Sequence, residues 1–249
     1  IECSAMSMKL LGNTFDLHLG GEDLIFPHHE DEIAQSEGAT GQPFVKHWLH
    51  GAHLLVEGKK MSKSLGNFYT LADLLDQGHE GRAIRQLMMS THYRETFNFT
   101  LDGLAGAKTA LARIDECIAK LREAADDEPV APQAEPIEKF TAALDDDLNI
   151  SSAWATVFDW VRDTNRRIDE GLSSAEAAAA LATWQNFDTV LAIGKEESTV
   201  PVDIQAKVEQ RTDARAAKDF ATADALRDEL HAAGWTIEDT PNGPRAKPL

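Results

Sequence analysis

Residues 15–38, FDLHLGGEDLIFPHHEDEIAQSEG, decide the fold of the first part of the chain. The apolar residues that begin at Phe15 predict a strand over 15–18, and the pair Gly20-Gly21 predicts a turn. Pro27 suits the first turn of a helix, because it lacks an N–H that would be left unpaired there. Acidic residues after Pro27 complement the positive end of the helix dipole, so we expect a helix over about 28–38. This strand-helix order is typical of a doubly wound α/β sheet.

From about residue 71 onward, apolar side chains recur at helical spacing, and the chain is predicted to be mainly helical. The clearest case is a helix over 101–121, whose apolar stripe is Leu104, Leu111, Ile114 and Ile118. Prolines predict a linker or loop over 126–136, and residues 194–203 are interpreted as a second linker. The remaining expectations are two or three helices over 137–193, helices over 204–216 and 220–233, and a small β-turn unit at the end.

Composition excludes several classes of protein. The chain has 249 residues, 24 basic against 42 acidic side chains and a formal charge of -18, which argues against broad non-specific binding of nucleic acid but permits local basic patches. It contains no apolar run of 18 residues, so no membrane span is predicted. Two cysteines, Cys3 and Cys117, exclude a disulfide scaffold and favour the cytosol. The start at Ile1-Glu2-Cys3 lacks a Met and is strand-like in sequence, so we expect a piece of a longer protein.

A first candidate site combines Cys3 with the run His28-His29-Glu30-Asp31-Glu32. A spacing of four places His28 and Glu32 on one helical face, and Cys3 could approach as a thiolate from a neighbouring strand. Three such ligands suit zinc, with the fourth ligand not identifiable from these residues. The alternative is a solvated acidic helix start beside a buried free cysteine.

A second candidate is the lysine loop, residues 58–67, GKKMSKSLGN. Its glycines supply hinges and its lysines supply ammonium donors, so the loop could clamp a polyphosphate and stabilise the charge that develops as a phosphoanhydride breaks. The alternative is a solvated basic turn, since the sequence is not a Walker motif.

Two weaker candidates complete the set. In His18-Leu-Gly20-Gly21-Glu-Asp23 the glycines permit close approach of a ligand and Asp23 could accept hydrogen bonds from a ribose; a tight turn with a capping Asp and a structural His18 is the alternative. In the helices over 204–233 mixed charges three and four apart are typical of exposed ion-paired helices, although an RNA-contacting face is possible.

Taken together and in this order, these stretches resemble the cysteinyl-tRNA synthetases, a family of class I aminoacyl-tRNA synthetases. The resemblance rests on the motifs already quoted and spans nearly the whole chain. Further motifs that carry it are Ile1-Glu-Cys-Ser-Ala-Met6, Leu87-Met-Met-Ser-Thr-His-Tyr-Arg94, Leu144-Asp-Asp-Asp-Leu-Asn149 and Arg215-Ala-Ala-Lys-Asp-Phe-Ala-Thr-Ala-Asp224.

The resemblance implies one Zn²⁺ per chain, held by Cys3, His28 and Glu32 together with a second cysteine that this chain lacks. Zinc can take the thiolate of L-cysteine as a ligand, whereas serine offers only a harder hydroxyl. ATP with Mg²⁺ is the implied co-substrate. The implied catalytic residues are His18, Lys60 and Lys63, and the implied ATP-binding residues are Gly20, Gly21, Asp23, Lys60, Ser62 and Lys63.

The resemblance also implies the organisation and partners of the chain. Residues 1–70 become the second half of a Rossmann-like catalytic domain, 71–193 a helical stem-contact and bundle region, and 203–249 a small anticodon-binding domain. The implied partners are tRNA(Cys), L-cysteine and ATP, for a cytoplasmic protein that we expect to be a monomer. Candidates for anticodon contacts are Arg215, Phe220, Asp224 and Asp239.

Two alternatives stay open. The cysteine ligase of mycothiol synthesis makes the same cysteinyl-adenylate but passes it to an amino sugar, and its chain ends before an anticodon domain, so residues 203–249 favour the tRNA enzyme. The other alternative is a non-catalytic zinc- or RNA-binding remnant, because the His-Ile-Gly-His element that class I enzymes place early in their nucleotide fold is missing here. Activity of these residues alone is therefore in doubt.

Overall fold

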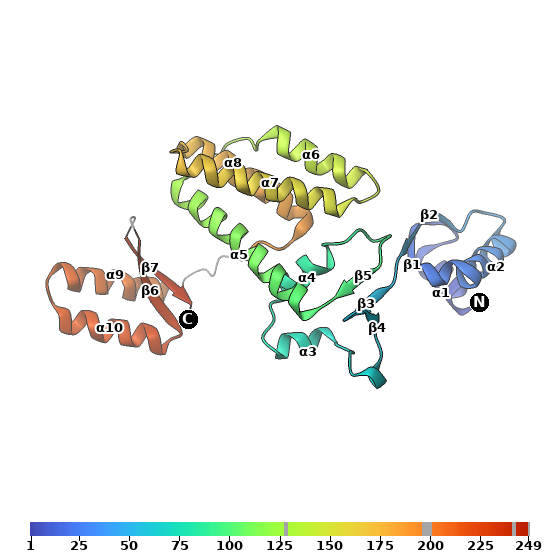
Figure 1. Cartoon of the computed structure of the whole chain (residues 1–249), viewed down its shortest axis with the longest axis horizontal. Helices are drawn as coiled ribbons and strands as arrows, with labels where there is room; N and C mark the ends of the chain where they lie inside the picture. The colour runs from blue at the N-terminus through green and yellow to red at the C-terminus, as the bar shows by residue number, and fades with distance from the viewer. Residues whose placement is uncertain (127–128, 196–200, 241–242, 249) are drawn as a thin grey trace. The chain divides into compact units, whose positions relative to one another are not determined.

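A computed structural model describes residues 1–126, 129–195, 201–240 and 243–248 (Figure 1). It divides the chain into two compact units, Ile1–Gly194 and Lys195–Leu249. Our boundary at residue 70 lies inside the first unit and stays a prediction. No described helix is both long enough and apolar enough to cross a bilayer.

The first 51 residues form a small α/β lobe, here called the first lobe. Its elements are α1 (Glu2–Leu11), β1 (Phe15–Gly21), α2 (Glu30–Thr40) and β2 (Val45–Gly51). Strands β1 and β2 pair in parallel with Phe15 opposite Val45 and Gly20 opposite His50. Short 3₁₀ and π turns over Glu22–Leu24 and Ile25–His29 join β1 to α2. The predicted strand-helix order is therefore confirmed.

Three local expectations in the first lobe are wrong. The strand-like start is a helix, because α1 is rich in residues that lose little freedom in a helix, such as Ala5 and Leu10. The pair Gly20-Gly21 belongs to strand β1 instead of forming a turn. The regular helix begins at Glu30, two residues late, because Phe26 is extended (φ -134°, ψ 131°), as residues before proline prefer to be.

A three-stranded sheet with two short helices follows the first lobe. The strands are β3 (Leu54–Val56), β4 (Lys59–Lys60) and β5 (Phe97–Phe99), in the order β4-β3-β5. Strands β3 and β4 form an antiparallel hairpin, and β5 lies parallel to β3. The lysine loop includes β4 and a 3₁₀ turn, Lys63–Leu65, and the chain then continues to helices α3 (Leu71–Asp76) and α4 (Gly81–Met88).

Four long helices make up the rest of the first unit: α5 (Leu101–Ala124), α6 (Ala134–Asp145), α7 (Ile150–Asp169) and α8 (Ser174–Leu191). The apolar stripe predicted for 101–121 is confirmed, because its four residues are all buried in one continuous core. Figure 1 shows α6, α7 and α8 side by side with α5 leading into them. The predicted first linker is shorter than expected, since α6 begins at Ala134 and takes Pro136 into its first turn.

The second unit contains α9 (Val202–Ala216), α10 (Phe220–Ala232) and the antiparallel hairpin of β6 (Trp235–Thr240) with β7 (Gly243–Pro248). It has a small core of its own, formed by Ile204, Val208, Leu230 and Ala246 with Trp235 and Ile237 packed against it. The two predicted helices and the terminal β unit are confirmed. Of the second predicted linker, residues 196–200 lie outside the described residues.

Candidate metal centre and nucleotide site

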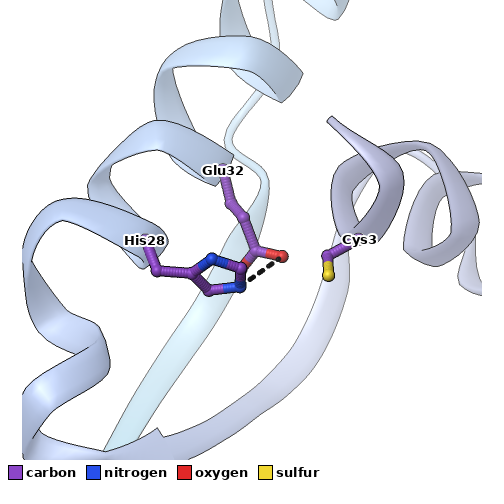
Figure 2. Close-up of side chains that lie close together, drawn as sticks. All are labelled: Cys3, His28 and Glu32. Atoms are coloured by element: carbon purple, nitrogen blue, oxygen red, sulfur yellow. Dashed lines mark ion pairs between the residues drawn. The ribbon is translucent and has the colours of Figure 1, made fainter.

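Three predicted ligands come together in the first lobe. Cys3 lies in the first turn of α1, His28 in the π turn, and Glu32 in the first turn of α2. Their ligand atoms all lie within 4.8 Å of one another, and Figure 2 shows the three side chains pointing toward one space from two helices. Cys3 therefore approaches from a helix instead of from the strand that we expected.

Packing of α1 against α2 brings Cys3 to this position. The neighbouring residue Ser4 is buried, and its hydroxyl donates a 2.9 Å hydrogen bond to Oε1 of Gln35 on α2. Cys3 itself is exposed, so the alternative of a buried free cysteine beside the acidic helix does not describe it. The side chain of Cys3 is thus held next to α2 and stays accessible.

Glu32 is the buried carboxylate of this group, with 2% of its surface exposed. Its Oε2 accepts a 2.8 Å hydrogen bond from Nε2 of His18, and its Oε1 lies 3.8 Å from Nε2 of His28. Oε1 is buried and has no hydrogen-bond partner among the described residues. A buried oxygen without a partner is costly, and a cation beside it would remove that cost.

The donor set fits zinc. One sulfur, one imidazole nitrogen and one carboxylate oxygen are ligand types of protein zinc sites. With bonds of about 2.0–2.3 Å, the ligand atoms around a tetrahedral zinc lie roughly 3.3–3.5 Å apart. The 3.8 Å distance between Nε2 of His28 and Oε1 of Glu32 is close to that spacing.

Behind Glu32 lies an aromatic cluster that the sequence did not reveal. Nδ1 of His29 is 2.8 Å from Nε2 of His50, and the rings of His18 and His29 each lie within 5 Å of the Trp48 ring, at 4.8 and 4.9 Å. Burial, with His18 nearby, lowers the pKa of His29. The signal that could have found Trp48 and His50 is the parallel register, which places them opposite His18 and Gly20.

His18, His29 and Glu32 form a second possible ligand set. The first set is favoured, because His18 and His29 already have hydrogen-bond partners in Glu32 and His50. The oxygen of Glu32 that lacks a partner is the one near His28. His18 and His29 are therefore better placed to orient the ligands than to bind the ion.

The glycines after His18 lie at the carboxyl end of β1, the edge where parallel sheets bind ligands. A Cβ on Gly20 would come within 2.6 Å of the His29 ring, and one on Gly21 within 2.5 Å of Oδ1 of Asp23. Gly20 is thus required for packing of His29, while Asp23 is exposed. Contact of these residues with a nucleotide stays a prediction.

The lysine loop is exposed at Lys59, Lys60 and Lys63, and Lys63 lies 5.3 Å from the centre of the Phe68 ring. Its flanking glycines, Gly58 and Gly66, have positive φ of 72° and 67°. The hydroxyls of Ser62 and Ser64 are 2.8 Å apart. The loop therefore presents ammonium groups and hydroxyls to solvent, as a site for a polyphosphate requires.

In the second unit, three predicted contact residues surround the connection between α9 and α10. Arg215 lies in the last turn of α9, Phe220 begins α10 and is 62% exposed, and Asp224 pairs with Arg227 at 3.1 Å. An exposed aromatic ring at this position is available for stacking. The side chain of Asp239 lies outside the described residues.

Family models cover most of the chain. They are described as tRNA synthetases class I (C) catalytic domain over residues 1–109, DALR domain over residues 139–194, and Cysteinyl-tRNA ligase anticodon binding domain over residues 198–243.

Relatives of this chain include proteins named cysteine-tRNA ligase. That of Chlamydia pneumoniae is 45% identical, with 100% of this chain and 54% of the relative covered. Those of Protochlamydia amoebophila and Symbiobacterium thermophilum are 45% and 42% identical, covering 99% and 98% of this chain and 53% and 55% of the relatives. The chain thus spans about half the length of the curated relatives it matches.

A solved LeuRS from Agrobacterium radiobacter K84, in a ternary complex with tRNA and LeuAMS, has a similar fold. The TM-score is 0.52 at 20% identity, over 72% of this chain and 26% of that one. At this identity the likeness concerns the fold alone.

Proposed function

Because the chain belongs to the cysteine-tRNA ligase family, we propose that it contributes to the ATP-dependent activation of L-cysteine and its transfer to tRNA(Cys). The observation that carries this proposal is the group of Cys3, His28 and Glu32, with the buried Oε1 of Glu32 lacking a partner among the described residues. The anticodon-binding match over residues 198–243 favours tRNA over an amino sugar as acceptor.

Cys3, His28 and Glu32 are proposed to hold one Zn²⁺. When bound there, zinc supplies a soft site for the thiolate of L-cysteine, which the hydroxyl of serine fills far less well. His18 is proposed to keep Glu32 in its binding orientation through the 2.8 Å hydrogen bond, and to lie beside the bound amino acid. Selection of cysteine then rests on sulfur chemistry and not on the size of a pocket.

The lysine loop is proposed to bind the phosphates of ATP, which Mg²⁺ accompanies. The carboxylate of cysteine attacks the α-phosphorus, and pyrophosphate leaves as cysteinyl-adenylate forms. Lys60 and Lys63 stabilise the negative charge that grows on that leaving group, and Ser62 offers a hydroxyl beside it. Gly20, Gly21 and Asp23 are proposed to receive the adenosine at the end of β1.

In the second step, the terminal ribose hydroxyl of tRNA attacks the acyl carbon of the adenylate, and AMP leaves. The second unit is proposed to bind the anticodon, with Phe220 stacking on a base and Arg215, Asp224 and Asp239 hydrogen-bonding to bases. We propose a cytoplasmic location and a monomeric state for the protein.

Cobalt substitution tests the metal centre on this chain. Co²⁺ replaces zinc in such sites and absorbs light when sulfur binds it, so the 249-residue chain loaded with Co²⁺ reports each thiolate ligand. We expect a sulfur band from Cys3 that grows on addition of L-cysteine and not of L-serine. Cys3→Ala should lose the first band, and Glu32→Ala should lose metal binding. Asp31→Asn, an exposed acidic neighbour of Glu32, is the matched control.

Failure to bind Co²⁺ or Zn²⁺ would reject the proposed metal centre on this chain. An equal response to cysteine and serine would reject the proposed selection by sulfur. The activity itself is tested by supplying the segment of the Chlamydia pneumoniae relative that this chain does not span. Cysteine-dependent exchange of pyrophosphate into ATP should then appear, and it should be lost in Lys60→Ala.

A further inference from the structure

Asn67, at the end of the lysine loop, makes three hydrogen bonds through one side chain. Its Oδ1 accepts from the backbone N–H of Ser62 at 2.9 Å. Its Nδ2 donates to the backbone oxygens of Val56 at 3.1 Å and Lys60 at 3.2 Å. The half-buried carboxamide therefore joins the loop to strand β3 on one side and closes the loop on itself on the other.

Two of these contacts, at Lys60 and Ser62, flank Met61 in the lysine loop. The ammonium groups of Lys60 and Lys63 extend into solvent, so their positions depend on the main chain that carries them. Met61 packs against the apolar core and so anchors the loop to it. Asn67 restrains the main chain on both sides of Met61, because its side chain hydrogen-bonds to the carbonyl of Lys60 and to the N–H of Ser62.

A second asparagine serves as a comparison. Oδ1 of Asn98, on β5, accepts from the N–H of Gly58 at 2.8 Å, before the lysines begin. It holds the hairpin turn, whereas Asn67 holds the main chain of the lysine segment itself. The two residues thus separate anchoring of the hairpin from positioning of the lysines.

We propose that Asn67 is a positioning residue for the polyphosphate site: its carboxamide holds the main chain at Lys60 and Ser62 before the ligand arrives. This rests on the proposed role of Lys60 and Lys63 as phosphate-binding groups. A loop ordered in advance loses less conformational freedom on binding, so the same lysines bind a polyphosphate more tightly. Without Asn67, part of the binding free energy is spent on ordering the loop.

The test is a double-mutant cycle on the 249-residue chain, with inorganic pyrophosphate as the probe and binding followed by calorimetry or phosphorus NMR. Lys60→Ala should weaken binding, and Asn67→Ala should weaken it by about tenfold. The loss in the double variant should be smaller than the sum of the two single losses, because part of the effect of Asn67 acts through the position of Lys60. Asn98→Ala is the matched control and should change binding by less than about threefold.

A second readout follows the loop without any ligand. In Asn67→Ala, trypsin should cut after Lys60 and Lys63 at least about tenfold faster than in the parent chain, while thermal unfolding of the helices stays unchanged. If Asn67→Ala does not fold, Asn67→Ser replaces it in both experiments.

The outcomes separate the two ideas. If the parent chain does not bind pyrophosphate, or binds it equally well in Lys60→Ala, the proposed function of the loop fails, and the positioning role fails with it. If Lys60→Ala weakens binding but Asn67→Ala does not, the positioning role alone is overturned. Strictly additive losses in the cycle would also overturn it, because they would show that Asn67 acts independently of Lys60.

Discussion

The first lobe and the helical region of α5 to α8 have opposite interiors. Among the described residues of the first lobe, Phe44 is the one buried hydrophobic side chain, while Ser4, His29, Glu32 and Ser36 are buried and polar. In the helical region, a continuous core of leucine, isoleucine, tryptophan, phenylalanine and alanine side chains is buried instead. The interior of the first lobe therefore positions the side chains of the candidate metal centre. The apolar interior of the helical region supplies stability.

Large apolar side chains of the two regions also differ in exposure. Leu10 and Phe26 of the first lobe are 78% and 77% exposed. In the helical region, Trp154 and Trp160 are nearly covered, and the indole N–H of each donates a hydrogen bond, to Met89 and Gln133 respectively. From this comparison we expect that the buried polar cluster and the buried apolar core can be changed independently, and five predictions test or sharpen that expectation.

The largest effect is expected from Phe187→Ala in α8. Phe187 is fully buried against Phe140 and Trp160, so its removal should leave a cavity and lower the free energy of unfolding by about 3–5 kcal/mol. Urea unfolding followed by circular dichroism measures this, with Val190→Ala, 48% exposed on the same helix, as control. Zinc content under native conditions should not change; a loss of zinc would show that the two interiors are coupled.

The next largest effect is expected in the reactivity of the two cysteines. Burial raises the pKa of the Cys117 thiol from 9.0 to about 11, whereas Cys3 is exposed. In metal-free protein at about pH 8, iodoacetamide should modify Cys3 more than about 100-fold faster than Cys117, as measured by peptide mass spectrometry. Added Zn²⁺ should protect Cys3 alone. Comparable rates would mean that the helical core opens readily.

The same shift predicts a pH dependence of stability. The folded pKa of Cys117 lies above the unfolded value, so the unfolded chain releases its proton first as pH rises. The contribution of the neutral thiol is complete below pH 9.0 and is lost as the pH approaches 11. Cys117→Ala should remove this part of the alkaline decline.

A smaller effect is expected from His18→Phe in the first lobe. The substitution keeps a ring beside Trp48 but removes the donor to Oε2 of Glu32, so zinc affinity should fall by about 10- to 100-fold. Competition with a chromophoric chelator measures the change, and His47→Phe, an exposed position on β2, is the control. An unchanged affinity would show that Glu32 needs no orienting partner.

The smallest effect is expected at the N-terminus of α8. Ser173 caps this helix by accepting from the N–H of Glu176, and Ser173→Ala should cost about 1 kcal/mol of stability in the helical region. Thermal unfolding measures it against Ser151→Ala, an exposed serine in the first turn of α7. A loss as large as that of Phe187→Ala would mean that caps, not the core, stabilise this region.

Much of the fold was predictable because it follows from local pattern. The stripe of Leu104, Leu111, Ile114 and Ile118 determined α5, and the Pro-bearing segment predicted where the helices are interrupted. The spacing of His28 and Glu32 predicted two ligands on one side of a helix start. The prediction that residues 1–3 are strand-like was wrong, because so short a segment does not distinguish a strand from a helix.

By itself, the sequence determined which residue types could serve as ligands and phosphate donors, because side-chain chemistry and helical periodicity act over a few residues. Tertiary structure alone decided that α1 packs on α2 and brings Cys3 to Glu32, that parallel pairing of β1 with β2 sets Trp48 and His50 behind the ligands, and that Asn67 reaches back to β3. Such approaches join segments far apart in the chain. They depend on the packing of whole elements, which no local pattern encodes.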